Sequence, residues 1–338
     1  MHRIARYDQD LAFSSPRDAL SDLVSHLSFC TSAKYSADLI RARHGVAGKD
    51  AVARGRRISA HMRTALDFVD QSISSRPEVA AVGCYYAILN LAKCYILASA
   101  HWSKLDSRLL HGLAYKTYVK DSHKLPTEEL DLHPSGVIPT LYELIVGVSL
   151  SKQKVRMGDV YPYILDVGAE WELATGEAGR LASLTFEVRA DPQSRRLPWV
   201  EVIGPTTHAL TARVFPALVG FRKWKGSPNG FAGPPLTHGA DEMKVLQSHV
   251  RRFLLYDSHT HRSVTPVSGR RLMLPQELPL ALAFYHLSSI QRYNPEFMAK
   301  LKDSAFWSVV VSLQWHGLQK FALLAWSYLQ QRNVLINA

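Results

Sequence analysis

Cysteine is scarce in this chain, which has only Cys30, Cys84 and Cys94 among 338 residues. An odd and sparse set of cysteines does not make a disulfide framework, and no two of these three have the spacing of zinc ligands. We therefore expect free thiols in a reducing compartment, which favours a cytoplasmic protein.

Long uninterrupted apolar runs are also lacking. The chain begins Met-His-Arg-Ile-Ala-Arg, without the apolar stretch of a signal peptide. The longest apolar segment covers residues 79–100, but Asn90 and Lys93 interrupt it. The segment therefore predicts a core helix rather than a membrane span, and we expect no membrane partner.

The common catalytic signatures are missing too. The sequence has no P-loop, dinucleotide fingerprint, serine elbow or zinc-protease motif, which argues against nucleotide hydrolysis and hydride transfer. Asp257, His259 and His261 alternate as metal ligands on a strand would. No distant partner ligand can be identified for them, so we predict neither a metal site nor a cofactor.

Acidic residues are outnumbered, with 29 Asp and Glu against 40 Lys and Arg, for a formal net charge of +11. A positive field attracts phosphates and speeds their encounter with the protein. RNA or another nucleic acid is therefore the predicted partner, with the alternative that many basic proteins bind no nucleic acid.

The pattern of apolar residues predicts an α+β fold that is mainly helical, with a small antiparallel sheet in the middle of the chain. We expect an N-terminal helical region at 1–150, a small β-rich region at 151–260, and a C-terminal helical region at 261–338 that packs on the first. Within this scheme, residues 121–136 are expected to form a loop and 305–330 one long helix. The predicted strands cover residues 161–165, 181–189, 199–203, 210–215 and 252–256.

Three residues are candidates for catalysis: Arg56, His61 and His111. Cleaving RNA without a metal needs a base for the 2′-hydroxyl, an acid for the leaving oxygen and a cation for the phosphate. Arg56 and His61 lie on a predicted helix, where the alternative is a solvated basic face with Arg57 nearer to His61. His111, followed by Gly112, is either an acid or base or a structural residue.

Six further residues are candidates for binding nucleic acid. Asn90 and Lys93 are three residues apart and so share one side of a helix. Arg292, at a helix end, can hold a phosphate or a backbone carbonyl. Lys223, Trp224 and Lys225 interleave cations with an aromatic ring that can stack on a base, or else form a loop anchored by the Trp.

Three segments carry a family resemblance: 85–93 (YYAILNLAK) with 111–113 (HGL), 136–144 (GVIPTLYEL) and 286–295 (HLSSIQRYNP). In their order and spacing they resemble the YaaC-like family of bacterial proteins. The double-Tyr helix is also similar to the core helix of HEPN proteins, which are helical bundles. Many of those are metal-independent ribonucleases of toxin or anti-phage systems that use an Arg, four to six residues and a His.

The HEPN resemblance implies a nucleic-acid-binding effector of bacterial defence and, more specifically, a metal-independent ribonuclease. Arg56 and His61 match the family's spacing, although they precede the double-Tyr segment rather than follow it. The alternative function is a non-catalytic subunit of a multiprotein defence assembly. Its contact surfaces would be the apolar C-terminal helix and the loop at 221–239.

Overall fold

The chain forms two compact units in the computed structural model. One unit contains residues 9–179 and 276–338, and the other contains residues 1–8 and 180–275. We call them the helical unit and the strand unit. The structure describes residues 10–13, 19–105, 110–115, 122–165, 167–177, 181–183, 185–189, 199–203, 222–223, 230–232, 255–257, 262–266 and 275–336.

Helix α4 (Pro77–Ala98) is the centre of the helical unit. Pro77 fits the first helical position because its missing N–H would be unpaired there in any residue. The helix is apolar on nearly all sides, as a helix surrounded by others must be. It is long and apolar enough to cross a membrane, but 78% of its most apolar window is buried inside the protein. It is therefore a core helix, as the sequence predicts.

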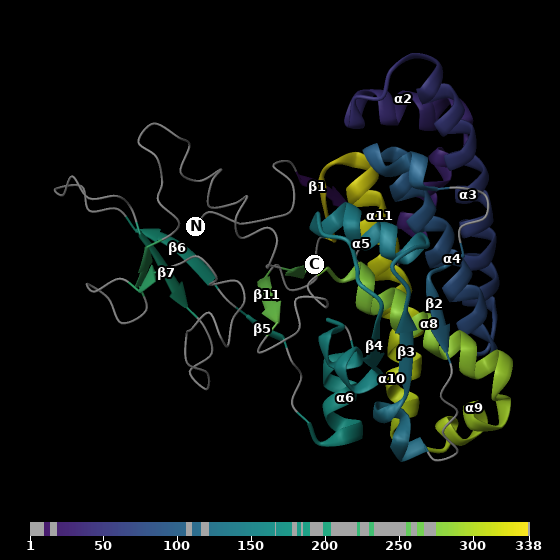
Figure 1. Ribbon diagram of the computed structural model, residues 1–338, viewed down its shortest axis with the longest axis vertical. Helices are drawn as coiled ribbons and strands as arrows, with labels where there is room; N and C mark the ends of the chain where they lie inside the picture. Colours follow the sequence, from purple (N-terminus) through teal and green to yellow (C-terminus); the bar gives the residue numbers. More distant parts are fainter. Residues whose placement is uncertain are drawn as a thin grey trace. The chain divides into compact units, whose positions relative to one another are not determined.

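The N-terminal helices cover one side of α4 (Figure 1). They are α1 (Ala19–Ser28), α2 (Ala33–His44) and the long α3 (Gly48–Ser74), with the short 3₁₀ turn η1 (Phe29–Thr31) between the first two. Gly55 of α3 lies against α2, where a Cβ atom would come within 2.7 Å of the Ala37 backbone nitrogen. The absence of a side chain at Gly55 thus allows α2 and α3 to pack closely.

The C-terminal helices cover the opposite part of α4, and Gln291 ties α8 to it. The Gln291 amide accepts from Val82 N at 3.1 Å and donates to the Val79 carbonyl at 2.9 Å. The Asn294 side chain accepts from Phe297 N at 3.3 Å and so caps α9. These elements are α8 (Glu277–Tyr293), α9 (Pro295–Lys302), α10 (Phe306–Ser312), the π-helical turn η8 (Leu313–Gly317) and α11 (Leu318–Gln330).

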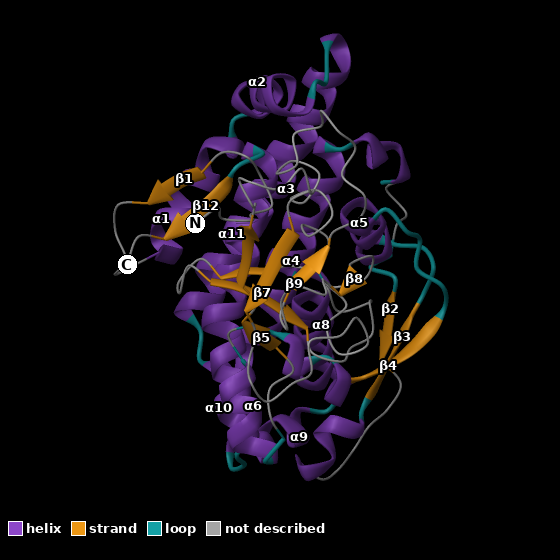
Figure 2. Ribbon diagram, turned by 90° about the vertical axis from the view of Figure 1, so that its left-hand side faces the viewer, coloured by secondary structure: helices purple, strands orange, loops and turns teal. Residues whose placement is uncertain are grey.

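A three-stranded antiparallel sheet lies at one edge of the helical unit (Figure 2). Its order is β2-β3-β4, with Leu113 opposite Leu132 and Glu129 opposite Arg156. Two end strands, β1 and β12, pair in parallel. The remaining elements are β1 (Asp10–Phe13), η2 (Ala100–Lys104), β2 (Leu113–Tyr115), η3 (Ser122–Thr127), β3 (Glu129–Leu132), α5 (Val137–Val146), β4 (Gln153–Arg156), η4 (Met157–Asp159), η5 (Tyr161–Tyr163), α6 (Gly168–Thr175) and β12 (Asn333–Ile336).

The strand unit contains two antiparallel sheets within the residues that the structure describes. One has the order β10-β11-β5 and the other β6-β7-β9-β8. Their strands are β5 (Leu181–Ser183), β6 (Thr185–Arg189), β7 (Trp199–Ile203), β8 (Arg222–Lys223), β9 (Gly230–Ala232), β10 (Leu255–Asp257) and β11 (Arg262–Pro266).

The predicted fold class, mainly helical α+β with a small antiparallel sheet in mid-chain, is confirmed. Two local predictions are wrong. Residues 161–163 form a 3₁₀ turn rather than a strand, because Pro162 favours a turn. The segment expected to be a loop, 121–136, contains strand β3. Residues 210–215 lie outside the described residues, as do 252–254 of the last predicted strand.

Candidate functional site

His61 of α3 and Asn90 of α4 form a polar pair where these two helices pack together. His61 Nδ1 lies 3.0 Å from Asn90 Oδ1, and Asn90 Nδ2 donates to the Tyr86 carbonyl at 2.8 Å. A carbonyl can only accept, so this second bond fixes which end of the amide carries the N–H groups. Asn90 Oδ1 must then accept from His61 Nδ1–H. Neutral His61 therefore keeps the lone pair on Nε2, where it can act as a base.

Lys93 lies one turn further along α4 and is half-buried. Burial lowers the pKa of its ammonium group. Its positive charge in turn lowers the pKa of both His61 and His111, after the larger effect of burial on each imidazole. Lys93 thus acts on two histidines that are 50 residues apart in the sequence (61 and 111).

His111 lies in a loop that is held by the first turn of α5. The Leu110 carbonyl accepts from Val137 N at 3.0 Å, and the His111 carbonyl accepts from Ile138 N at 3.2 Å. Gly136, at φ +132°, comes so close that a Cβ there would lie 2.5 Å from the Gly112 nitrogen. The backbone position of His111 is therefore fixed. Its side-chain Nδ1 is buried and has no hydrogen-bond partner among the described residues.

Two tyrosines pack against His111. Its ring centroid lies 6.0 Å from that of Tyr85 and 5.3 Å from that of Tyr285, and the two tyrosine rings are 5.3 Å apart. The Tyr85 hydroxyl is buried and, like His111 Nδ1, has no partner within the described part of the chain. Burial raises the pKa of Tyr85, so this hydroxyl stays protonated and can donate.

Arg292, at the end of α8, adds a further positive charge. Its Nε donates to the Ser288 carbonyl at 3.1 Å, and its guanidinium lies 5.1 Å from the centroid of the Tyr293 ring. After burial, its charge is the next cause of the lowered pKa of His111. Arg57 acts in the same way on His61 and donates to the Leu105 carbonyl at 2.9 Å.

We call this set the cationic cluster: His61, Asn90, Lys93, His111 and Arg292, with Arg57, Tyr85 and Tyr285 beside it. Among the described residues, the charges that shift the two histidine pKa values are positive. Cations held close together attract an anion, and burial strengthens that attraction. The cluster therefore has the charge and the donors of a phosphate-binding site.

A hollow opens beside the cationic cluster. It has a volume of about 550 Å³, and His111 belongs to both features. Between Gly112 and Gly136 the two loops that form it are in backbone contact. The residues that line it are Lys104, Leu110, His111, Gly112, Leu113, Ala114, His133, Pro134, Ser135 and Gly136.

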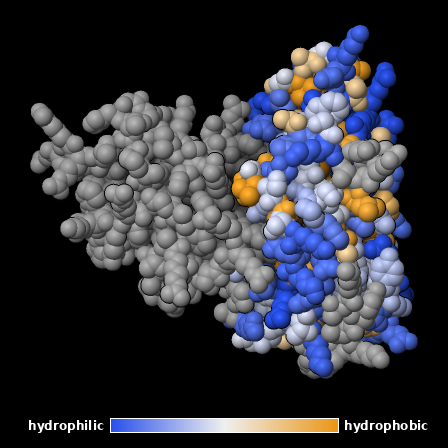
Figure 3. Space-filling view, viewed as in Figure 1, coloured by the Kyte–Doolittle hydropathy of each residue, from blue (hydrophilic) through white to orange (hydrophobic). Residues whose placement is uncertain are grey.

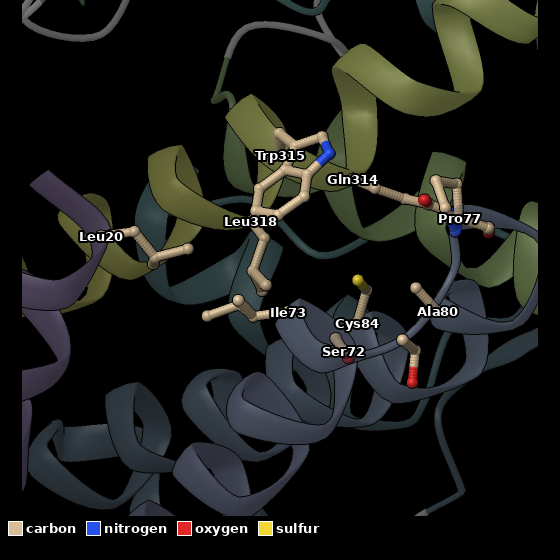
Figure 4. Close-up of a pocket in the computed structure, with 10 residues that line it drawn as sticks. Leu20, Ser72, Ile73, Pro77, Ala80, Cys84, Gln314, Trp315 and Leu318 are labelled. Carbon is tan, nitrogen blue, oxygen red and sulfur yellow. The ribbon is translucent and has the colours of Figure 1, made fainter. Parts of the chain in front are cut away.

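A second pocket, next to the π-helical turn, is too small for a ligand (Figure 4). Its volume of about 10 Å³ is at most that of one water molecule. Trp315 and Leu318 project from the C-terminal helices toward Ile73 and Cys84. Burial raises the pKa of the Cys84 thiol to about 11, so the thiolate that reactions require is rare there.

Five of the predicted site residues belong to the cationic cluster. His61 contacts Asn90 directly, the charge of Lys93 lowers the pKa of His61 and His111, and the charge of Arg292 lowers that of His111. Arg56 is exposed on α3, and Arg57 is the arginine that acts on His61. Lys223 lies in β8, where its side chain is not described, and Trp224 and Lys225 lie outside the described residues, as do His259 and His261. Sequence reasoning missed Tyr85 and Tyr285 as site residues, although Tyr85 stands in the double-Tyr segment.

Metal ligands do not gather within the described ranges, where His, Cys, Asp and Glu form no group of three or more. The cationic cluster itself contains the ammonium group of Lys93 and the guanidinium group of Arg292. Their positive charges suit an anion better than a divalent cation.

Comparison with protein families shows which family the chain resembles. The model of the YaaC-like Protein family matches residues 28–314, which is most of the chain. The chain belongs to the YaaC-like family. No curated protein and no solved structure matches it. All three segments that carry the resemblance begin within the matched range, and so does every residue of the cationic cluster.

Proposed function

We propose that this YaaC-like protein binds RNA and cleaves it without a metal ion, as HEPN ribonucleases do. The observation that carries the proposal is that Lys93 acts on both His61 and His111. Two imidazoles and a cation are the groups that cleavage at a 2′-hydroxyl requires. The net charge of +11 favours the same substrate. A role in bacterial defence rests on the HEPN resemblance alone.

The reaction assigns one proton transfer to each histidine. His61 Nε2 takes the proton of the 2′-hydroxyl, and the 2′-oxygen forms a bond to phosphorus. The bond from phosphorus to the 5′-oxygen breaks, and protonated His111 gives its proton to that oxygen. The products are a 2′,3′-cyclic phosphate and a 5′-hydroxyl, and water returns both histidines to their starting states. Lys93 and Arg292 stabilise the charge on the phosphorane.

The lowered pKa of His111 fits this role once RNA is bound. In the free protein, burial, Arg292 and Lys93 keep its imidazole neutral near pH 7. A bound phosphate offsets the two positive charges and raises the pKa again. His111 is therefore protonated where a substrate phosphate is present, and binding takes up protons.

The test uses purified protein, single-stranded RNA and excess chelator. We expect products with cyclic phosphate ends, and a loss of at least about 100-fold in rate for His61→Gln and for His111→Gln, on the scale of general acid–base catalysis. Arg56→Gln is the matched control on the exposed face of α3 and should keep nearly full activity. If wild-type protein neither cleaves nor retains RNA at low salt, the proposal is wrong.

A second candidate function is a protein-interaction subunit, for which Trp315 is the specific observation. This side chain is 46% exposed in the π-helical turn, and Ile73 beside it is 38% exposed. Exposed aromatic anchors are typical of interface hot spots. Helix α11 does not serve as that surface, because its apolar residues pack on α1, α2 and α4. Full biological function after His111→Ala would favour this second candidate.

A further inference from the structure

We propose that the hollow beside His111 receives one unpaired nucleobase, so that the substrate is single-stranded RNA. This inference rests on the proposed function and adds the form of RNA that the site selects. It starts from a geometric fact: His111 lines the hollow, and its ring also packs against Tyr85 and Tyr285 beside the cationic cluster. A nucleotide has the same layout, with a flat apolar base next to a charged phosphate.

The hollow has the size and lining for a base. Its volume of about 550 Å³ falls within the range of about 300–1,000 Å³ that small-molecule pockets have. Leu110, Leu113, Ala114 and Pro134 supply apolar surface, on which a base can pack. The Leu110 side chain is 77% exposed and is therefore accessible from solvent.

Polar groups around the hollow can read the edge of a base. The imidazole of His133 and the hydroxyl of Ser135 line it, and both can donate or accept a hydrogen bond. Lys104 also lines it and is held by Glu143 at 2.7 Å. Specific ligand sites usually combine mostly apolar walls with a small number of polar groups, as this hollow does.

The walls of the hollow are pre-formed. His133 N donates to the Gly112 carbonyl at 2.9 Å, and the Leu110 carbonyl accepts from Val137 N. These bonds hold the loop at 110–112 against the loop at 133–136. Because the walls are already ordered, they lose little conformational entropy when a ligand binds. A ligand as small as one base, which makes few contacts, can therefore bind there.

Two unpartnered atoms mark where the sugar and phosphate would lie. Tyr85 Oη and His111 Nδ1 are both buried without a partner among the described residues, on rings 6.0 Å apart. A buried polar atom without a hydrogen bond costs about 1–3 kcal/mol. Ribose hydroxyls and phosphate oxygens offer the missing acceptors and donors.

Only an unpaired base can enter such a hollow. In an A-form duplex each base is stacked and paired, and side chains cannot reach it through the deep, narrow major groove. Single-stranded RNA lets a base turn out of the stack and insert. The cationic cluster alone would not distinguish the two forms, because both carry phosphates. The hollow is therefore the feature that sets the preference.

The test compares two probes of equal length by fluorescence anisotropy. One is a labelled single strand of 2′-fluoro RNA, which cannot be cleaved because it has no 2′-hydroxyl, and the other is the same strand in a duplex. We expect wild-type protein to bind the single strand at least about tenfold more tightly at equal salt, on the scale of one stacked base. Equal affinity for the two probes would overturn the inference.

Ala114→Phe fills the hollow, and Ala169→Phe places the same side chain on the exposed surface of α6 as a control. We expect Ala114→Phe to lose the preference for the single strand and to keep its affinity for the duplex. If circular dichroism shows that this variant is unfolded, His133→Ala replaces it, with the same expected loss. Unchanged preference in a folded variant contradicts the inference.

The two proposals fail in different ways. If neither probe binds at low salt, the proposed function is wrong, and the inference falls with it. If both bind equally, the cationic cluster still binds phosphates, and only the role of the hollow is wrong.

Discussion

His61 and His111 are half-buried residues whose protonation opposes folding. Burial lowers the pKa of each from the ordinary 6.5, and neighbouring positive charges lower it further. In the unfolded chain both have ordinary pKa values, so the unfolded state binds more protons once the pH falls below about 6.5. The stability that the two neutral histidines contribute is thus present above pH 6.5. It is lost as the pH falls from 6.5 through their lowered pKa values in the folded protein.

This residue-scale effect predicts how stability depends on pH. Between pH 7.5 and pH 5, we expect the wild-type free energy of unfolding in urea to fall, and to fall less in His61→Gln and in His111→Gln. His44, whose pKa is also lowered by burial, should keep part of the dependence in both variants. The control is His316→Gln, at an exposed position. A dependence in the His61 and His111 variants as steep as in wild type would contradict the effect.

At the scale of elements, sequence patterns found the helices better than the strands. Helix α4 repeats apolar residues at three- and four-residue steps, which is enough to predict it. Strands β2, β3 and β4 have only three or four residues each, too few for an alternation to stand out near Pro126 and Pro134. The sequence predicts a strand at 161–163 because aromatic residues are common in strands. Tyr161 is instead a core residue of a 3₁₀ turn, and its ring stacks on Trp171 at 5.6 Å.

The site shows the same limit of sequence patterns, which report local spacing but not how elements pack together. The chemistry of His61, Asn90, Lys93 and His111 could be recognised from residue types and local spacing. Their meeting could not, because it depends on how α3 lies against α4. A shift of α3 by one residue would turn His61 by about 100° away from Asn90. No pattern within a single helix carries that information.

The close backbone contact between Gly112 and Gly136 predicts that adding one methyl group at Gly136 lowers the stability of the fold. In Gly136→Ala the new Cβ would meet the Gly112 backbone at 2.5 Å, at a φ of +132° that side chains rarely adopt. We expect a loss of roughly 2 kcal/mol or more in the free energy of unfolding, since strain and clash add. Gly147→Ala, at φ +76° with open space around it, should lose only about 1 kcal/mol. Equal losses in the two variants would show that the contact is not tight.

The surface and interior of the helical unit differ sharply at the scale of the whole molecule. On the face drawn in Figure 3, the described surface is mostly hydrophilic, with apolar residues in small separate groups. The buried residues are mostly apolar, but they include a polar network. His286 Nε2 is hydrogen-bonded to Glu128, its Nδ1 lies 3.0 Å from Tyr161 Oη, and Tyr115 donates to Glu128 at 2.6 Å. Glu128 and His286 are both fully buried.

This network connects parts of the chain that are far apart in sequence, and it holds α8 in place. His286 is next to Tyr285, which packs on His111, so the network also supports the cationic cluster. Glu128→Gln replaces an acceptor of two hydrogen bonds with an amide that can accept only one of them at its oxygen. We expect a loss of roughly 1–3 kcal/mol in the free energy of unfolding, the cost of leaving a buried polar group without its hydrogen bond. We also expect weaker RNA binding in the folded fraction, because α8 positions Tyr285 and Arg292.

Glu129→Gln is the matched control for that prediction. Glu129 is the next residue in the chain and makes ion pairs at the surface with Lys154 and Arg156, both at 3.3 Å. Water and salt screen such pairs, so its removal should leave stability and RNA binding nearly unchanged. Urea unfolding of both variants measures the difference directly. If Glu128→Gln were as stable as Glu129→Gln, the buried network would not hold the fold together, and α8 would owe its position to apolar packing and to the Gln291 hydrogen bonds.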